Sequence, residues 1–270
     1  MKKWNCNFEL GESLTDEQLD FFDEHGVIIF RNFLSKEKVD LYIGELKRLE
    51  SEWLSEKRQK VNGIPLKFGK DEAGNLTIQR LCFSSLYSNA LHGLLDEPKL
   101  QALTGLLGPY EGRVGENEKD GLVINNYINT PNSTFTQMGW HTDSPRDLFL
   151  GQKIMPMLNV GLHLDTCLFE NGGLRVLPGT HKQNMLKLLF GKKYFIDNTD
   201  DNREVGFDIH AGDLTVHDGR TWHRVKQSPL LGEASRRRVM YVPIITGKYM
   251  PKDEKSRTPF YHKFTGKVHH

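Results

Sequence analysis

Two residues that could bind a metal ion stand close together in the segment GWHTDSPR, residues 139–146. His141 and Asp143 are separated by one residue, and because side chains alternate along a strand, both would project to the same side. An imidazole and a carboxylate suit iron, manganese or zinc, and a second histidine would complete a facial triad that leaves positions open for substrate and oxygen. The segment therefore predicts two of three metal ligands.

The third ligand is expected further along the chain, where five histidines follow: His163, His181, His210, His217 and His223. The first three lie in a predicted core strand or beside turns, which leaves the last two. Trp222 directly precedes His223, as Trp140 precedes His141. A bulky neighbour can pack in the core on the opposite face while the histidine faces a cavity. We therefore favour His223, with His217 as the second choice.

A basic triplet, Arg236, Arg237 and Arg238, opens an apolar strand beyond His223. An arginine that enters a barrel needs an anion, and its planar guanidinium suits the far carboxylate of a dicarboxylic acid. A solvated strand end explains two of the three arginines equally well.

The elements that would position these residues are short strands. From Leu122 onward the chain consists of short apolar or alternating runs separated by Gly, Pro, Asn and Asp: LVINNYI, MLNVGLHL, GLRVLP, DLTVHD and RVMYVPII. This pattern is typical of an antiparallel sandwich or jelly roll. The predicted fold is mainly β with flanking α-helices around a double-stranded β-helix (jelly-roll, cupin-like) core.

The first 110 residues read as mainly helical. A Thr15-x-x-Gln18 capping box begins one helix that Gly26 ends, and Ser35 begins a second helix with one apolar stripe. Residues 60–80 predict an irregular excursion or hairpin. Because no Ser/Gly/Pro-rich linker separates the parts, we expect a single domain over residues 1–270, with residues 1–110 packed on the outer face of a core at 120–250.

The amino-acid composition of the chain bears on its binding partners and its location. Lys and Arg number 36 against 35 Asp and Glu, so the net charge of +1 provides no field that would hold nucleic acid. Three widely spaced cysteines predict a reducing, cytoplasmic location, and no apolar run is long enough for a membrane span or a signal-peptide core. We expect a small-molecule substrate and a monomer or homodimer.

Nearly the whole chain resembles the phytanoyl-CoA dioxygenase-like family of iron(II)- and 2-oxoglutarate-dependent oxygenases. The similar segments are LTDEQLDFFDEHGVIIFRNFLSKEKVD near the start, WHTD at 140–143, LNVGLHLDTCLFENGGLRVLPGTHK at 158–182, GDLTVHD at 212–218, WHRV and RRRVMYV. An Asn-Gly-x-Leu-x-x-x-Pro-Gly-Thr-His stretch downstream of Trp-His-x-Asp is more specific than either part alone.

The resemblance implies roles for individual residues. His141, Asp143 and His223 match the iron ligands of the family, and Arg237 matches its 2-oxoglutarate anchor, with Arg238 or Arg236 as alternatives. The family usually places that arginine about eleven residues after the distal histidine, where this chain has Ala234. A polar residue on the strand before the motif often touches the cosubstrate in the family, and the candidates here are Asn125, Asn126 and Asn129.

The resemblance further implies a reaction in which Fe(II), 2-oxoglutarate and O2 convert an unactivated C–H of a small molecule to an alcohol, with release of succinate and CO2. Related halogenases have Ala or Gly in place of Asp143, so the carboxylate favours hydroxylation, desaturation or another oxidation. Two alternatives are a jelly-roll metal-dependent hydrolase or isomerase and a non-catalytic jelly-roll binding protein. Four residues could meet a polar substrate at the pocket mouth: Lys67, Gln79, Arg80 and Arg146.

Overall fold

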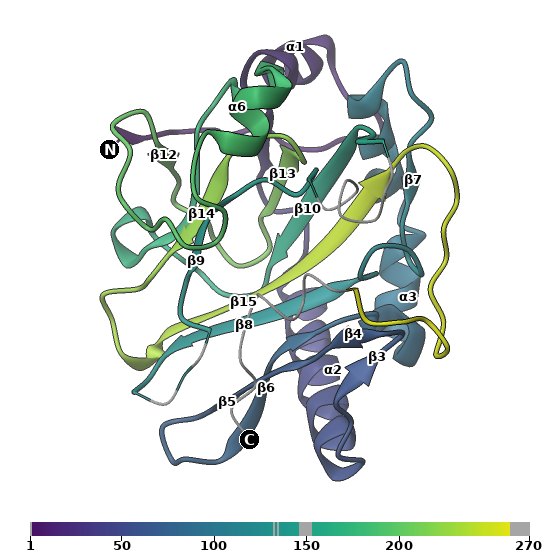
Figure 1. The fold of residues 1–270 in the computed structure, drawn as a ribbon, viewed down its shortest axis with the longest axis vertical. Helices are drawn as coiled ribbons and strands as arrows, with labels where there is room; N and C mark the ends of the chain where they lie inside the picture. The colour runs from purple at the N-terminus through teal and green to yellow at the C-terminus, as the bar shows by residue number, and fades with distance from the viewer. Residues whose placement is uncertain (1, 132, 134, 146–152, 260–270) are drawn as a thin grey trace.

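The computed structural model describes residues 2–131, 133, 135–145 and 153–259. Two main β-sheets form a sandwich, and the helices lie outside it (Figure 1). From β9 to β15 the strands alternate between the sheets, except that the short β12 follows β11 in the same sheet: β9, β11, β12 and β14 belong to the smaller sheet, and β10, β13 and β15 to the larger one. This alternation is the arrangement of a jelly roll, so the predicted fold class is confirmed.

The larger sheet has the strand order β2-β13-β10-β15-β8-β6-β5, and β7 pairs with β15. Neighbouring strands in it are antiparallel. The strands are β2 (Val27–Phe30), β5 (Lys67–Lys70), β6 (Leu76–Leu81), β7 (Arg113–Val114), β8 (Val123–Asn129), β10 (Met157–His163), β13 (Leu214–Asp218) and β15 (Gly232–Ile245).

The smaller sheet has the order β1-β12-β11-β14-β9, in which β1 and β12 are parallel. Its strands are β1 (Lys2–Lys3), β9 (Met138–His141), β11 (Gly173–Val176), β12 (Val205–Gly206) and β14 (His223–Lys226). A separate hairpin joins β3 (Lys60–Val61) to β4 (Ile64–Pro65).

The larger sheet has two different faces. On its outer face, cross-strand pairs are apolar, as where Leu162 stands opposite Met240 and Met240 opposite Ile124. All three are buried in one core cluster with Leu46 and Leu49 of α2. Its inner face turns toward the smaller sheet and is largely polar, because alternate residues of the same strands point there. Residues on this face include Asn125, Tyr127, Asn159, His163, Thr215, His217 and Arg237.

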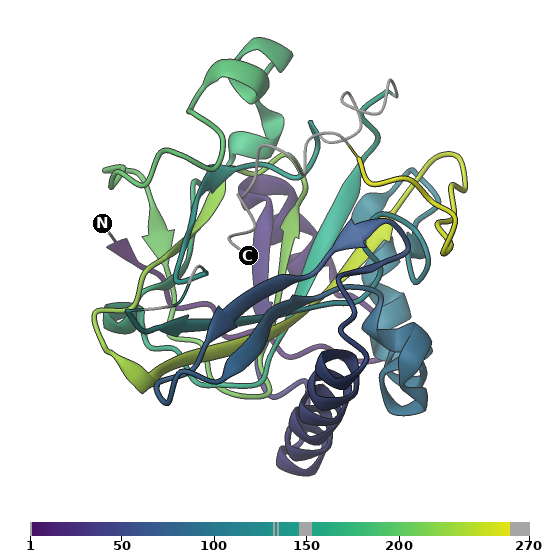
Figure 2. The same cartoon turned by 60° about the horizontal axis from the view of Figure 1, so that its bottom comes forward.

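The helices are α1 (Asp16–His25), α2 (Lys36–Ser55), α3 (Asn89–Leu95), α4 (Pro98–Ala102) and α6 (Met185–Phe190), with short 3-10 turns at Ser84–Tyr87, Leu103–Leu107, Phe169–Asn171 and Thr180–Lys182. The capping box at Thr15 and Gln18 is present, and Gly26 ends α1 in the left-handed conformation. Figure 2 shows α2 and α3 side by side against the larger sheet, while α6 stands at the opposite end of the molecule. None of the helices in the described ranges is long and apolar enough to span a membrane.

Residues 60–81 are more regular than their composition indicates. They hold the β3–β4 hairpin and the strands β5 and β6, and β6 pairs with β8 through Arg80 and Leu81. The local pairings β3–β4 and β5–β6 agree with the hairpin alternative, whereas the pairing of β6 with β8, some 45 residues away in the chain, could not be seen in the composition. The division of the chain into domains stays a prediction.

Candidate metal centre

His141, Asp143 and His223 lie close together at the paired ends of β9 and β14 in the smaller sheet. His141 is the last residue of β9 and His223 the first of β14, and the two stand opposite each other in the antiparallel pair. The Asp143 backbone N–H donates to the Gly219 carbonyl over 2.8 Å, which holds the turn after β9 against the turn before β14. One potential ligand atom from each of the three side chains lies within 4.8 Å of the others.

Both imidazoles are oriented by a carbonyl two residues earlier. His141 Nδ1 lies 2.8 Å from the Gly139 carbonyl oxygen, and His223 Nδ1 lies 3.0 Å from that of Thr221. A carbonyl can only accept, so Nδ1 carries the proton and Nε2 keeps its lone pair for a metal ion. Backbone hydrogen bonds to metal-binding histidines commonly fix this tautomer.

The protonation states suit a cation. Burial is the main cause that lowers the pKa of both His141 and His223, which favours the neutral form of each imidazole. Burial alone would raise the pKa of Asp143, but the surrounding histidines, His223 foremost, hold it below its ordinary range. Two neutral imidazoles and one ionised carboxylate form a donor set that fits iron.

Behind the histidines, Trp140 and Trp222 are buried together with Leu177. The Trp140 indole N–H donates to the Thr199 carbonyl over 2.8 Å. The paired tryptophans therefore pack in the core, as the sequence predicts, while each following histidine faces the interior of the sandwich.

Strand alternation separates the three arginines. The Arg238 guanidinium forms an ion pair with Asp165 at 2.6 Å, and Arg236 donates to the Asn126 side-chain oxygen over 2.8 Å and pairs with Glu233. Arg237 points the other way, into the sandwich. Its Nη1 donates to the Lys226 carbonyl and its Nη2 to the Thr136 carbonyl, over 2.9 and 3.2 Å.

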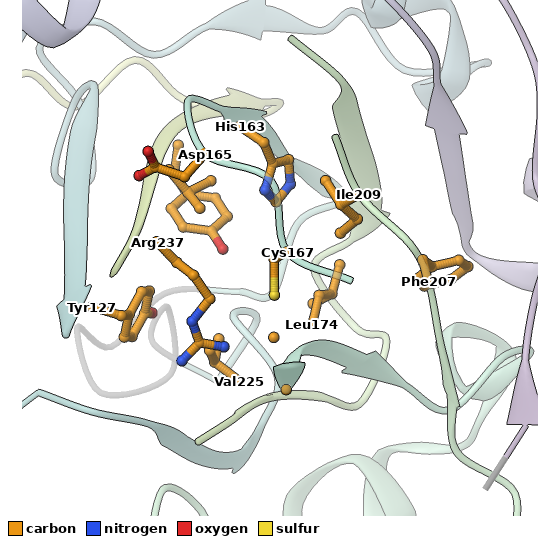
Figure 3. A pocket seen from close by; sticks show the side chains of 13 residues that line it. Tyr127, His163, Asp165, Cys167, Leu174, Phe207, Ile209, Val225 and Arg237 are labelled. Carbon is orange, nitrogen blue, oxygen red and sulfur yellow. The ribbon is translucent and has the colours of Figure 1, made fainter. Parts of the chain in front are cut away.

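Arg237 differs from its neighbours in having no carboxylate partner within the part of the chain that the structure describes, and its buried Nε has no hydrogen-bond partner there. It lines a narrow internal cavity with Tyr127, Cys167 and Val225 (Figure 3). Val225 follows His223 by two residues on the same strand, so the cavity lies beside the metal-binding side chains. Gly173 also lines it: with φ +84°, an added Cβ there would lie 2.7 Å from the Cys167 sulfur.

Residues 22–228 match the family model of phytanoyl-CoA dioxygenase (PhyH). The chain belongs to the phytanoyl-CoA dioxygenase family. This membership confirms the family that the sequence motifs resemble. No curated protein matches the chain.

Several solved structures share the fold of this dioxygenase-family chain. The α-ketoglutarate-dependent epimerase SnoN from nogalamycin biosynthesis superposes with a TM-score of 0.64 at 17% identity, over 91% of this chain and 92% of its own. HygX from Streptomyces hygroscopicus, with nickel and 2-oxoglutarate bound, gives 0.61 at 16% identity over 88% and 90%. EvdO2 from Micromonospora carbonacea var. aurantiaca, complexed with 2-oxoglutarate, gives 0.60 at 18% identity over 90% and 96%.

The cofactors expected from the sequence are those of these relatives. HygX is also solved with iron bound, and both HygX and EvdO2 hold 2-oxoglutarate. In this member of the phytanoyl-CoA dioxygenase family, the set able to hold the metal is the His141, Asp143 and His223 cluster.

Two further side chains of the larger sheet face Asp143. Asn159 donates its side-chain N–H to Asp143 Oδ2 over 3.2 Å, and His217 Nε2 lies 3.5 Å from the same oxygen. Asn159 and His217 are cross-strand partners, so both project to the inner face. His217, the second choice as ligand, therefore lies beside the cluster and faces its carboxylate. Asn159 was not among the residues predicted from the sequence, although a polar residue inside the apolar run MLNVGLHL was a signal for it.

The segment after α6 covers one side of the metal centre. The Phe195 ring stacks on His141, with centroids 4.8 Å apart and planes at 27°, and its backbone has φ +62°. The Tyr194 hydroxyl donates to the Leu188 carbonyl over 2.6 Å and lies 2.8 Å from the Thr142 hydroxyl. Nothing in the sequence around Phe195 indicates this contact, since it forms across some 50 residues of chain.

The other candidate residues are placed as follows. Asn126 faces the outer side, where it accepts from Arg236, whereas its neighbour Asn125 faces inward and donates to the Tyr127 hydroxyl over 3.2 Å. Asn129 donates to the Ser228 carbonyl at a sheet end over 2.9 Å.

The four residues expected at the pocket mouth also lie in different surroundings. Gln79 donates to the Ser133 hydroxyl, and Arg80 forms an ion pair with Asp120, each over 2.6 Å. Lys67 faces the interior, and Arg146 lies outside the described residues.

Proposed function

We propose that this protein is an Fe(II)- and 2-oxoglutarate-dependent oxygenase that hydroxylates a small-molecule substrate. The observation that carries the proposal is a pairing on the inside of one sandwich: a two-histidine, one-carboxylate cluster beside an inward arginine that has no carboxylate partner among the described residues. A metal-dependent hydrolase needs the metal-binding cluster, but its reaction does not require an inward arginine without a carboxylate partner.

In the proposed mechanism, Nε2 of His141, Nε2 of His223 and the Asp143 carboxylate hold the metal. Iron bound there would supply, with 2-oxoglutarate and O2, the oxidising power for the substrate C–H, with one oxygen atom of O2 ending in succinate as CO2 is released and the other in the substrate. The Arg237 guanidinium binds the far carboxylate of 2-oxoglutarate through charge-assisted hydrogen bonds. Because this arginine is already held by two carbonyl groups, it loses little freedom when the anion arrives.

The remaining residues shape the site. Asn159 holds the Asp143 carboxylate in one orientation through Oδ2, the oxygen that also lies 3.9 Å from His223 Nε2. Phe195 covers the His141 imidazole and keeps water from that side. Tyr127 lines the cavity with its buried ring and narrows the space around the cosubstrate.

Hydroxylation is the outcome that we favour, because Asp143 is a carboxylate at the position where related halogenases have Ala or Gly. Relatives with this fold include the epimerase SnoN and the carbocyclase SnoK, both α-ketoglutarate-dependent and from nogalamycin biosynthesis. SnoN has been solved with nogalamycin RO, and by analogy we propose a small organic molecule as substrate here. Incorporation of ¹⁸O from ¹⁸O2 into the product would identify hydroxylation, and a product without the label would indicate another oxidation.

The test of the proposed function is spectroscopic. Protein loaded with Fe(II) without oxygen and mixed with 2-oxoglutarate should develop the visible metal-to-ligand charge-transfer band, and admission of O2 should release succinate. A matched sample of Arg237→Met should require more 2-oxoglutarate for the same band. A protein that binds iron but gives no band with 2-oxoglutarate would favour the hydrolase or isomerase alternative, and one that binds no metal would favour a non-catalytic binding protein.

A cytoplasmic location stays a prediction, and the three free cysteines support it. The monomeric or homodimeric state is also a prediction.

A further inference from the structure

Several cations of the larger sheet lie on its inner face, among them Arg237 and Lys67 on β5, whose cross-strand partner Arg80 faces the same way. The charge of Arg80 is balanced by Asp120 at 2.6 Å. Lys67, by contrast, has no carboxylate within ion-pair distance among residues 2–131, 133, 135–145 and 153–259, and its ammonium packs on the Phe135 ring. An ammonium placed in this way lacks its usual partner.

A stacked aromatic pair separates Lys67 from Arg237. The Lys67 ammonium lies 4.5 Å from the Phe135 ring centroid, the Phe135 and Tyr127 rings stack at 4.4 Å with planes at 20°, and the Arg237 guanidinium carbon lies 5.5 Å from the Tyr127 centroid. Lys67, Phe135, Tyr127 and Arg237 therefore follow one another in a row. The two positive groups lie on opposite sides of the rings, so one small anion cannot contact both.

Lys67 lies close to the internal cavity, because its ammonium packs on Phe135 and Phe135 stacks on Tyr127, which lines the cavity. Burial, followed by the charge of Arg80, lowers the pKa of Lys67 to about 8. The side chain is partly buried, and the contact of its ammonium with Phe135 replaces only a small part of the lost hydration.

We propose that Lys67 forms a second anion subsite, which binds a carboxylate, sulfate or phosphate group of the substrate while Arg237 holds 2-oxoglutarate. This inference rests on the proposed function. A substrate anion would supply the missing partner of Lys67 and anchor the molecule beside the metal. The substrate class is then a small molecule with one anionic group and an oxidisable C–H that reaches the metal centre.

The experiment uses the full chain, loaded with Fe(II) and saturated with 2-oxoglutarate in the absence of oxygen. Paired probes are titrated into it: acetate, hexanoate and phenylacetate, each against its neutral primary amide. Binding is followed by the perturbation of the charge-transfer band and by calorimetry, so that no turnover is needed. The variants are Lys67→Met, Arg237→Met and the matched control Lys70→Met, which removes an exposed lysine from the same strand.

At least one acid should bind the wild-type complex about tenfold more tightly than its amide, the size expected for a hydrogen bond to a charged group. Lys67→Met should abolish this preference, Lys70→Met should keep it, and Lys67→Met should bind 2-oxoglutarate within about twofold of wild type. Because an unpaired, desolvated charge is removed, Lys67→Met should unfold at the same or a higher temperature than wild type.

Three results would overturn the inference: no acid preferred over its amide by the wild type, a preference that survives Lys67→Met, or a loss of 2-oxoglutarate affinity in Lys67→Met as large as in Arg237→Met. The last would assign Lys67 to the cosubstrate. A wild-type protein that gives no charge-transfer band at all would contradict the proposed function instead, so the two failures are distinguishable.

Discussion

The two faces of the larger sheet are built from alternate residues of the same strands, yet they differ in chemistry. Leu162 and Val216 point outward into an apolar core that includes residues of α2 and α3, and their exposed fractions are 0%. The next residues, His163 and His217, point inward and are also buried, beside Arg237 and the metal centre. Burial of polar groups costs free energy wherever their hydrogen bonds are incomplete, and both ring nitrogens of His217 are unpartnered among the described residues.

The two faces of the larger sheet therefore contribute differently to stability and to the site. The outer face stabilises the fold by removing apolar surface from water. The inner face gives up part of that stability and keeps polar groups ready for a metal and anions. Substitutions on the two faces should therefore have opposite consequences, and the following predictions are ordered from the largest expected effect to the smallest.

Asp143→Ala, at the metal centre that the inner face adjoins, should abolish succinate formation. Loss of a residue that hydrogen-bonds to a metal ligand typically lowers metal affinity or activity by roughly 10–100-fold, and loss of a ligand itself should have a larger effect. Iron affinity and succinate release are the measurements. Wild-type iron affinity in Asp143→Ala would remove this residue from the ligand set and point to His217.

Leu162→Ala, on the outer face, should lower the free energy of unfolding by about 2–5 kcal/mol, because it leaves a cavity in a close-packed core. Denaturant unfolding gives this value, and the 2-oxoglutarate affinity of the folded fraction should match that of wild type. If cosubstrate affinity fell as much as stability, the two faces would not be functionally separate.

Arg237→Met should weaken 2-oxoglutarate binding by about 100-fold, since two charge-assisted hydrogen bonds contribute roughly 1.5–3 kcal/mol each and the methionine keeps much of the side-chain volume. Titration of the charge-transfer band measures the affinity. Arg236→Met and Arg238→Met are the matched controls from the outer face and should stay near wild type; a loss in either one would move the anchor there.

His163 should make stability depend on pH. Burial lowers its pKa from 6.5 to about 4, so between these values the unfolded chain binds a proton that the folded chain does not. Stability is therefore lost as pH falls from 6.5 toward 4. Between pH 7 and pH 4.5, the loss of unfolding free energy should be smaller in His163→Gln than in wild type by about 2 kcal/mol. Parallel curves for the two proteins would show that His163 titrates normally.

Asn159→Ala should weaken iron binding by roughly tenfold, because the Asp143 carboxylate loses the group that orients it. Competition with a chelator gives the affinity, and Asn129→Ala, which alters a hydrogen bond at the sheet end, is the control. Equal effects in the two variants would assign Asn159 a purely structural role.

Much of the metal centre was predictable because its signals are local. His141 and Asp143 share one side of a strand end, and the preceding tryptophan recurs before His223, so residue types and short spacings favoured this cluster, with His217 as the second choice for its third member. The jelly roll followed from alternating apolar runs for the same reason.

Other features depend on register and on distant segments. The arginine triplet and the asparagines of β8 lie on strands in which successive side chains point alternately inward and outward. A shift of the strand register by one residue would turn each inward side chain outward. The sequence therefore left Arg236 and Arg238 as alternatives to Arg237 and did not separate the asparagines of β8, of which Asn125 faces inward and Asn126 outward. Phe195 contacts His141 from a segment that comes near it only in the folded chain, and no short pattern marks it. Lys67 was one of four polar candidates from the sequence, but its place against Phe135 depends on the pairing of β5 with β6.

The most direct test of this account is a crystal structure of the protein loaded with Fe(II) and 2-oxoglutarate without oxygen. We expect the iron on His141, Asp143 and His223, the far carboxylate of 2-oxoglutarate on Arg237, and the Lys67 ammonium left free of the cosubstrate. Iron coordinated by His217, or 2-oxoglutarate anchored by a residue other than Arg237, would contradict it.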